Sequence, residues 1–138
     1  MASDATPDLT RPVALIWHLA LTADWAAATA LGRYAVSTRG LTLERVGFIH
    51  CSYGRQVAGV AAQFYADETA PLTLLGIDTG RLAAAGIEVR AEPGDPAHLE
   101  GERFPHVYGA IPLGAVVETH GARIREGELL APTWMGRP

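Results

Sequence analysis

The sequence predicts an α+β fold in a single domain. A strand is followed by a helix twice in the first half of the chain and most of the second half reads as strands, an order typical of α+β proteins rather than of doubly wound sheets. The length of 138 residues suits one domain with one site. With 49% hydrophobic and 19% charged residues, the composition is that of a compact globular protein.

Local patterns predict the first elements of this fold. Residues 1–11 are small, polar and acidic and predict a flexible leader, so the domain is expected to span 12–138. A helix is expected at 22–32, with Thr22 as its N-cap and Gly32 as the residue in the left-handed conformation that ends it. Strands are expected at 13–20, 33–37, 46–52, 72–78, 87–92, 103–111 and 114–120, and a connecting turn at 38–46.

A second helix is expected from Ser52 to about Asp67. Its apolar face is predicted from helical spacing and consists of Val57, Val60, Ala61 and Phe64. Residues 80–86 predict a helical turn and 93–102 a loop. The tail that follows carries three large apolar residues, which should pack on the core or on a partner: Leu129, Leu130 and Trp134.

Charge and cysteine content narrow the classes of function. The formal net charge is −4 and the eleven basic residues are scattered, so we expect no surface for a phosphate backbone. A single cysteine cannot form an internal disulfide, and the N-terminal residues lack the pattern of a secretion signal, so a cytoplasmic location is expected. The longest apolar run is about half of the ~20 residues that cross a bilayer, so no membrane span is expected.

Histidines inside apolar strands are the main functional signal. Of the five histidines, His18, His50 and His106 lie in predicted strands. An imidazole on an apolar strand is either partly buried with a partner or lines a pocket. A structural role is favoured for each of them alone, but three together favour a shared pocket.

Strand geometry separates the reactive side chains near the middle of the chain. Because side chains alternate along a strand, His50 and Ser52 share one face while Ile49 and Cys51 share the other. Cys51 is therefore predicted to be a small buried core residue rather than a catalytic thiol.

Two kinds of site would use these histidines. One is a zinc or iron site with three imidazole ligands, but each ligand would come from a separate segment and no HxH or HExxH spacing is present. The other is an organic pocket in which imidazoles and hydroxyls bond a ribose or phosphate while Trp17, Tyr53 or Tyr108 stacks on a ring. The second suits the aromatic neighbours better, because Tyr108 shares its strand face with Phe104 and His106.

Two carboxylates are candidates for an acid or base in such a pocket. Glu92 shares a predicted strand face with Glu88 and Arg90, a pattern that also fits a solvated edge strand. The functional interpretation places Glu92 at the mouth of the pocket as an acid, a base or a positioning group. Glu102 is the weaker candidate because it lies in an evident loop.

The chain resembles the bacterial family catalogued as domain of unknown function 952. The resemblance rests on IWHLA, Trp25, GRY at 32–34, GFIHCS followed by Gln56, LTLLGID, VRAE and FPHVYGAIPLGAVV, and it covers about residues 13–120. That family is similar, at a remoter level, to the ADP-ribosyltransferase-like superfamily. The resemblance implies two small, curved, mainly antiparallel sheets that clasp NAD between them, with a few short helices.

The resemblance also implies roles for single residues. His18 corresponds to the first-strand residue that bonds the ribose beside nicotinamide, and His50 replaces the second-strand Tyr that stacks on nicotinamide. The late-strand Glu falls near 102–106, where this chain has His106, unless Glu92 or Glu102 serves. The expected catalytic residues are His18, His50, His106 and Glu92, and the expected cofactor-binding residues are Trp17, Ser52, Tyr53, Gln56 and Tyr108.

The expected function is binding of NAD, ADP-ribose or a related nucleotide in a cleft lined by His18, His50, Ser52, His106 and Tyr108. ADP-ribosyl transfer or hydrolysis would use His18 and Ser52 to hold ribose hydroxyls, and His50 or His106 to move a proton. Two alternatives stay open. One is a non-catalytic binding module or small homodimer in which the histidines are structural, and the other is a His-ligated metal site.

Overall fold

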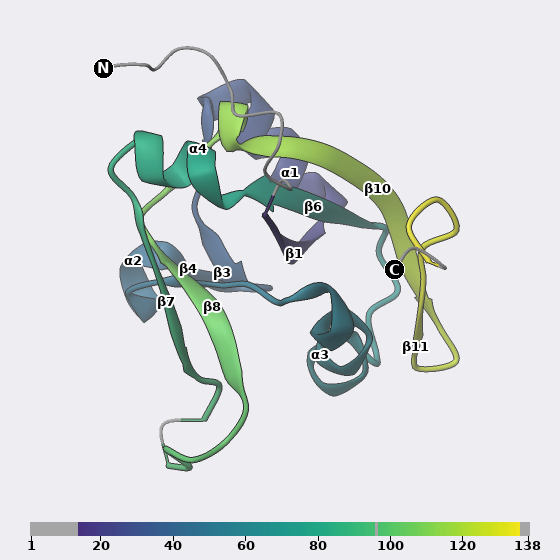
Figure 1. Cartoon of the computed structure of the whole chain (residues 1–138). Coiled ribbons are helices and arrows are strands. Elements are labelled where there is room, and N and C mark those ends of the chain that lie inside the picture. The colour runs from purple at the N-terminus through teal and green to yellow at the C-terminus, as the bar shows by residue number, and fades with distance from the viewer. Residues whose placement is uncertain (1–13, 96, 136–138) are drawn as a thin grey trace.

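Two antiparallel sheets form the frame of the computed structural model, which describes residues 14–95 and 97–135 (Figure 1). The predicted leader at 1–11 lies outside the described residues. The larger sheet contains, in spatial order, β1 (Leu15–Leu21), β6 (Leu72–Asp78), β10 (Val116–Arg125) and β11 (Glu128–Leu130). The smaller sheet contains β5 (Ile49–His50), β8 (Arg103–Tyr108) and β7 (Glu88–Pro93).

Two short ribbons complete the strands. They pair β2 (Arg33–Tyr34) with β9 (Ile111–Pro112), and β3 (Val36–Thr38) with β4 (Leu41–Thr42). Every strand pairing within the described residues is antiparallel. The α+β fold with small curved antiparallel sheets and a few short helices is therefore confirmed.

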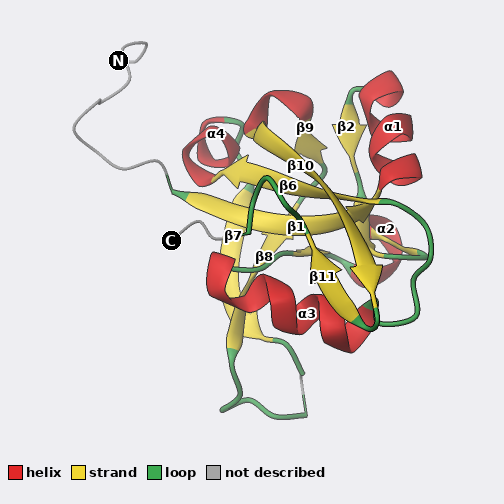
Figure 2. Cartoon of the chain, turned by 90° about the vertical axis from the view of Figure 1, so that its right-hand side faces the viewer, coloured by secondary structure: helices red, strands yellow, loops and turns green. Residues whose placement is uncertain are grey.

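Helices cover both faces of the larger sheet. Three of them are α1 (Thr22–Leu31), α3 (Val57–Phe64) and α4 (Thr79–Ala84), and the single turns are α2 (Leu43–Val46), η1 (Gly54–Gln56) and η2 (Leu113–Ala115). Figure 2 shows β1, β6 and β10 passing between α3 on one side and α1 and α4 on the other. None of the helices within the described ranges is long and apolar enough to cross a membrane.

Side chains of β1 point alternately to the two faces of the larger sheet, and each face carries its own hydrophobic core. Ile16 and Ala20 pack in a core with residues of α1 and α4, whereas Trp17 and Leu19 pack in a second core with residues of α3. The central strand β6 is buried from residue 72 to 77, which explains why its sequence is a nearly continuous apolar run.

A glycine in β6 allows a close approach that anchors the C-terminal tail. A Cβ at Gly76 would lie 2.8 Å from Cζ3 of Trp17, so the indole packs directly on the backbone of the neighbouring strand. Trp134 of the tail meets Trp17 edge to face, with ring centroids 5.5 Å apart, and Leu129 is buried in the same core. The apolar tail thus packs within its own chain.

The first helix begins differently from the prediction. Thr22 is the first helical residue rather than the N-cap, because β1 runs directly into α1 with Leu21 at the cap position. The Thr22 hydroxyl instead shares a 2.9 Å hydrogen bond with that of Thr73 in β6. The predicted turn at 38–46 is also wrong, since it contains β4 and α2, where Thr42 Oγ1 accepts a hydrogen bond from the backbone N–H of Arg45.

The strand predicted at 46–52 is shorter than expected because the chain changes partner within it. β5 ends at His50, the Cys51 N–H then donates to the carbonyl of Pro105, and Ser52 pairs with Trp17 of the larger sheet. Cys51 is buried in the core, as predicted, and burial raises the pKa of its thiol.

The predicted apolar face of the second helix is wrong at its last position. Val57, Val60 and Ala61 are buried, but Phe64 is 44% exposed. The helix ends at Phe64, and Tyr65 takes the core position, where its hydroxyl donates to the carbonyl of Leu19. Phe64 is thereby free to face the cavity described below.

Candidate functional site

The smaller sheet places His50 directly beside His106. These residues are cross-strand partners in the β5–β8 pair, and Arg90 of β7 is opposite His106 on its other side. Ile49 and Val107 alternate with them, face the hydrophobic core and are fully buried. One face of this small sheet therefore carries the polar side chains and the other face the core.

A chain of hydrogen bonds runs across the polar face. His50 Nδ1 lies 3.2 Å from His106 Nε2, and His106 Nδ1 lies 2.9 Å from Glu92 Oε1. An ionised carboxylate only accepts hydrogen bonds, so His106 donates to Glu92 through Nδ1. In the neutral pair, His106 Nε2 then accepts from the Nδ1–H of His50, which leaves His50 Nε2 without a proton.

Glu92 is the anionic end of this chain. The hydrogen bond from the Tyr108 hydroxyl, and then that from His106, lower the pKa of the Glu92 carboxyl. The same bond raises the pKa of Tyr108. Phe48 stacks on the His106 ring at a centroid distance of 4.0 Å and an interplanar angle of 15°, which fixes the imidazole plane.

His18, in β1, is hydrogen-bonded to the backbone of His50. Its Nδ1–H donates to the His50 carbonyl at 2.8 Å, and its Nε2 accepts from the Tyr34 hydroxyl at 2.8 Å. Burial lowers the pKa of His18 to about 4, so the ring is neutral at neutral pH. The three strand histidines thus belong to one connected network, and both nitrogens of His18 are used within the protein.

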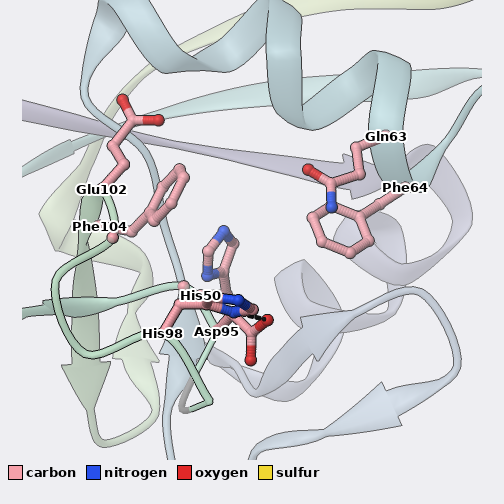
Figure 3. Close-up of a pocket in the computed structure, with 9 residues that line it drawn as sticks. His50, Gln63, Phe64, Asp95, His98, Glu102 and Phe104 are labelled. Carbon is pink, nitrogen blue, oxygen red and sulfur yellow. Dashed lines mark hydrogen bonds and ion pairs between the residues drawn. The ribbon is translucent and has the colours of Figure 1, made fainter.

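One cavity of the described chain lies over the side chain of His50. Its volume is about 220 Å³. Figure 3 shows the His50 imidazole between the Phe64 and Phe104 rings, whose centroids lie 6.3 and 5.0 Å from it. The lining residues come from α3, β5, β8 and the segment between β7 and β8: His50, Gln63, Phe64, Gly94, Asp95, His98, Gly101, Glu102 and Phe104.

His50 has an unsatisfied nitrogen in this setting. Among the described residues, Nε2 of His50 is the buried side-chain polar atom that has no hydrogen-bond partner. Burial first, and then the neighbouring His106 and His18, lower the pKa of His50 to about 4. Because a buried unsatisfied group costs about 1–3 kcal/mol, this nitrogen is a place where a donor group would bind favourably.

The residues expected to line one cleft are divided among three cavities. His50 lines the first cavity, whereas His106, Tyr108 and Glu92 line a second, somewhat larger cavity of about 260 Å³ together with Phe48 and Leu99. A third cavity, lined by His18, His50 and Ser52 among others, holds about 10 Å³, which is room for about one water molecule. The His50–His106 hydrogen bond links a side chain that lines the first cavity to one that lines the second.

Four other predicted residues do not line the cavity over His50. Trp17 lies in the second core, on the opposite face of β1 from His18, and Ser52 exchanges two backbone hydrogen bonds with it. The buried amide of Gln56 accepts from the backbone N–H of Tyr53 and donates to Glu102 and to the Arg103 carbonyl. Gln56 therefore positions Glu102, which does line the cavity over His50.

Several lining residues carried no functional signal in the sequence. Phe64 was assigned to the helix core, while Gln63, Gly94 and Asp95 sit in patterns typical of a solvated helix face and a loop. His98, in the segment predicted as a loop at 93–102, is exposed and pairs with Asp95 at 2.8 Å. The length of the loop between two well-patterned strands was the one available sign that it forms a wall of the site.

No group of three or more His, Cys, Asp or Glu side chains within the described residues is arranged to hold a metal ion. The imidazoles contact one another or the backbone in a row rather than converging on a point. The hydrogen-bonded row instead suits the binding of an organic ligand and the movement of a proton.

One family model matches most of the chain, and solved structures of one bacterial protein are similar to it. Residues 19–119 match the family model described as protein of unknown function (DUF952). The crystal structure of protein CC0527 from Caulobacter crescentus is similar, with 27% identity and a TM-score of 0.69 over 85% of this chain and 94% of that chain. The solution structure of the same protein gives 28% identity and a TM-score of 0.64 over 83% and 90%. A search of the curated proteins found no match.

Proposed function

The chain belongs to the DUF952 family, and we propose that it binds NAD, ADP-ribose or a related nucleotide in the cavity over His50. The observation that carries this proposal is the unpaired Nε2 of His50 between two aromatic rings. An acceptor beside apolar ring faces suits a ligand that combines a flat ring with hydroxyl or amide donors. The ring and ribose of a nucleotide have this combination.

The size of the cavity limits which part of the ligand enters. Sites that enclose a whole drug-sized ligand measure ~300–1,000 Å³, whereas the cavity over His50 measures about 220 Å³. The proposed occupant is therefore one end of the nucleotide, a ring with its adjoining ribose. In this arrangement a ribose hydroxyl donates to His50 Nε2, and Phe64 and Phe104 flank the ring.

The supporting residues have proposed positioning roles. His18 fixes the carbonyl of His50, and Gln56 fixes the carboxylate of Glu102. Trp17 and Ser52 join the larger sheet to the segment that follows His50. Tyr108 acts through Glu92, whose charge orients His106.

ADP-ribosyl transfer or hydrolysis is the chemical step that this arrangement would serve. In that step the attacking hydroxyl or water replaces the ribose hydroxyl as donor to His50 Nε2 and gives up its proton there, while its oxygen bonds the ribose carbon and the leaving ring departs with the electrons of the broken bond. Glu92 stabilises the resulting imidazolium through His106. A base with a pKa of about 4 is weak at neutral pH. Binding is accordingly the primary function proposed, and catalysis is secondary to it.

A purely structural function is the second candidate, because both ring nitrogens of His18 are bonded within the protein. In that case the histidines hold the fold of a binding module or of a small homodimer. Replacing His50 or His106 by Ala would then unfold the protein instead of leaving it folded without ligand affinity. Circular dichroism of the two variants separates these candidates.

Thermal unfolding with millimolar NAD or ADP-ribose tests the proposed function. A ligand at 100 times its Kd stabilises the folded state by about 2.7 kcal/mol, so the midpoint should rise by several degrees. The shift should be smaller in a His50→Asn variant, since Asn preserves a donor towards His106 but has no acceptor in the place of Nε2. An unchanged midpoint with both nucleotides contradicts the proposal.

A further inference from the structure

The second cavity combines one carboxylate with apolar walls. Glu92 is the only Asp or Glu among the described residues that line it, and no described Arg or Lys does so. Phe48, Pro93 and Leu99 supply the apolar walls, and Leu99 is 70% exposed. The volume of about 260 Å³ lies below the ~300–1,000 Å³ of sites that enclose a whole drug-sized ligand. The cavity therefore has room for one arm of a ligand beside one anionic group.

The two oxygens of the Glu92 carboxylate differ in what they contact. Oε1 accepts from the Tyr108 hydroxyl and, at 2.9 Å, from the Nδ1–H of His106. A carboxylate oxygen has two lone pairs, so these two bonds use both lone pairs of Oε1. Oε2 has no hydrogen-bond partner among the described residues, and the side chain is 32% exposed. The carboxylate is thus fixed through one oxygen and presents the other to a ligand.

The surroundings of Glu92 preserve its negative charge. The hydrogen bonds from Tyr108 and His106 hold the pKa of the Glu92 carboxyl below its usual range. The nearby cation is Arg90, whose guanidinium carbon lies 4.3 Å from the centroid of the Tyr108 ring. Arg90 is paired with Glu88 at 2.9 Å and does not line the cavity. A positively charged ligand group is therefore the kind that this cavity attracts.

A single free oxygen also selects the kind of cation. A guanidinium binds a carboxylate best through two parallel N–H···O bonds, one to each oxygen. Tyr108 and His106 already occupy Oε1 of Glu92, so a guanidinium cannot form this pair. An ammonium is a compact charge that needs only one acceptor oxygen. The bonding of Glu92 thus favours an ammonium over a guanidinium.

We propose that the second cavity binds an alkylammonium group, the chemistry of a small primary amine or of a lysine side chain. The ammonium donates to Oε2 of Glu92, and its carbon chain lies along Phe48 and Leu99. This site goes beyond nucleotide binding, because it uses a cavity that His50 does not line.

Three compounds with the same carbon chain separate charge from apolar contact: pentylammonium, pentylguanidinium and 1-pentanol. Nitrogen-15 NMR titration measures each Kd, and the amide signals of Gly94 and Leu99 locate the site because both residues line it. The Kd of pentylammonium should be about fivefold below that of pentanol, the ratio that ~1 kcal/mol produces for a partly exposed ion pair. Pentylguanidinium should bind at least about twofold more weakly than pentylammonium. Equal affinity for pentylammonium and pentanol, or tighter binding of pentylguanidinium, overturns the proposal.

A matched pair of charge variants assigns the binding to Glu92. Glu92→Gln keeps the shape of the side chain and removes its charge, so the affinities for pentylammonium and pentanol should become nearly equal. Glu100→Gln removes a charge from an exposed residue of the adjoining loop that does not line the cavity, and should leave their ratio unchanged. Circular dichroism checks that both variants are folded. Equal effects of the two substitutions would show a general charge effect and overturn the assignment.

Tyr108→Phe tests why an ammonium is preferred. The substitution keeps the ring but removes the hydroxyl that donates to Oε1 of Glu92, so one lone pair of that oxygen becomes available. Pentylguanidinium should then gain at least about twofold in affinity relative to pentylammonium. An unchanged ratio in the folded variant overturns selection by the single free oxygen.

A comparison of pentylammonium with Nα-acetyl-lysine methylamide distinguishes the two sources of the ammonium. Tighter binding of the lysine derivative identifies a lysine side chain as the ligand, because the flanking amides then also contact the protein. Tighter binding of pentylammonium identifies a small free amine. If neither compound shifts the Gly94 and Leu99 signals, the second cavity is not an ammonium site.

Discussion

His50 is hydrogen-bonded at one ring nitrogen and unpaired at the other. Its Nδ1 contacts His106, whereas Nε2 is buried without a partner in the described chain. Its carbonyl is held by His18. The protein thus fixes the position of a neutral imidazole whose acceptor nitrogen has no partner among the described residues.

The tautomer of His50 is directly measurable. Nitrogen-15 NMR of the imidazole side chains should show the Nδ1–H tautomer for His50 at neutral pH, because Glu92 forces His106 to donate in the other direction. Glu92→Gln removes the fixed carboxylate and should mix the two tautomers. A protonated Nε2 in the unliganded protein contradicts the proposed direction of the hydrogen-bond chain.

The acceptor of His50 should contribute measurably to ligand affinity. His50→Asn leaves the ligand donor without its partner, which costs about 1–3 kcal/mol, or roughly 5- to 150-fold in Kd. Calorimetry with NAD gives this ratio, and circular dichroism confirms that the variant is folded. An unchanged Kd in a folded variant shows that the ligand does not use His50.

At the scale of elements, Phe64 shows how the end of a helix creates a wall of the site. α3 ends at Phe64, and Tyr65 enters the core in its place. Phe64→Ala should weaken ligand binding about fivefold, the effect of losing ~1 kcal/mol of ring contact, with little loss of stability because the side chain is 44% exposed.

Leu31→Ala is the matched control for Phe64→Ala. It truncates another apolar side chain at the end of a helix, 63% exposed and remote from the cavity lining. The two variants should have similar unfolding midpoints, and ligand affinity should fall in Phe64→Ala alone. If ligand affinity falls equally in both variants, the Phe64 ring has no specific role in binding.

Substitution of two glycines of the larger sheet should have opposite effects on the stability of the protein. Gly76→Ala places a Cβ 2.8 Å from Trp17 and 3.2 Å from Cβ of Glu118, and should destabilise the protein by about 1–3 kcal/mol. Gly121→Ala in the adjacent strand meets nothing within 4 Å and should be neutral or slightly stabilising. Urea unfolding of both variants measures the difference. Equal stabilities contradict the packing of Trp17 on β6.

Most elements were predictable from local pattern. The apolar run of β6, the left-handed stop at Gly32 and the burial of Cys51 follow from alternation and turn chemistry. The Glu92–His106 contact was not predictable in detail, because it depends on the register of β7 against β8. Phe64 was misplaced because helical spacing does not reveal which residue ends the helix.

At the scale of the whole molecule, buried histidines link stability to pH. The pKa of His18 and of His50 is about 4 in the folded state, against 6.5 for an exposed histidine. The unfolded chain therefore binds protons more readily between these values, so the free energy of unfolding falls as pH drops from about 6.5 towards 4. The loss should reach a few kcal/mol, at about 1.4 kcal/mol per pKa unit.

Urea unfolding at several pH values measures this loss. Asp67 and Glu68 have lowered carboxyl pKa values and contribute in the same direction, but below about pH 4.5, so the range from 6.5 to 4.5 reports on the histidines. His50→Asn should reduce the slope in this range. A free energy that does not change between pH 6.5 and 5 contradicts burial of the neutral imidazoles.

The pair of backbone hydrogen bonds between Trp17 and Ser52 connects the two sheets. The Trp17 N–H donates to the Ser52 carbonyl at 2.8 Å, and the Ser52 N–H donates back at 2.7 Å, two residues after His50. Any movement that separates the sheets must break this pair and expose both amide protons to solvent. The deuterium exchange rates of these two amides therefore measure how often the sheets part, and a ligand that spans them should slow both rates together.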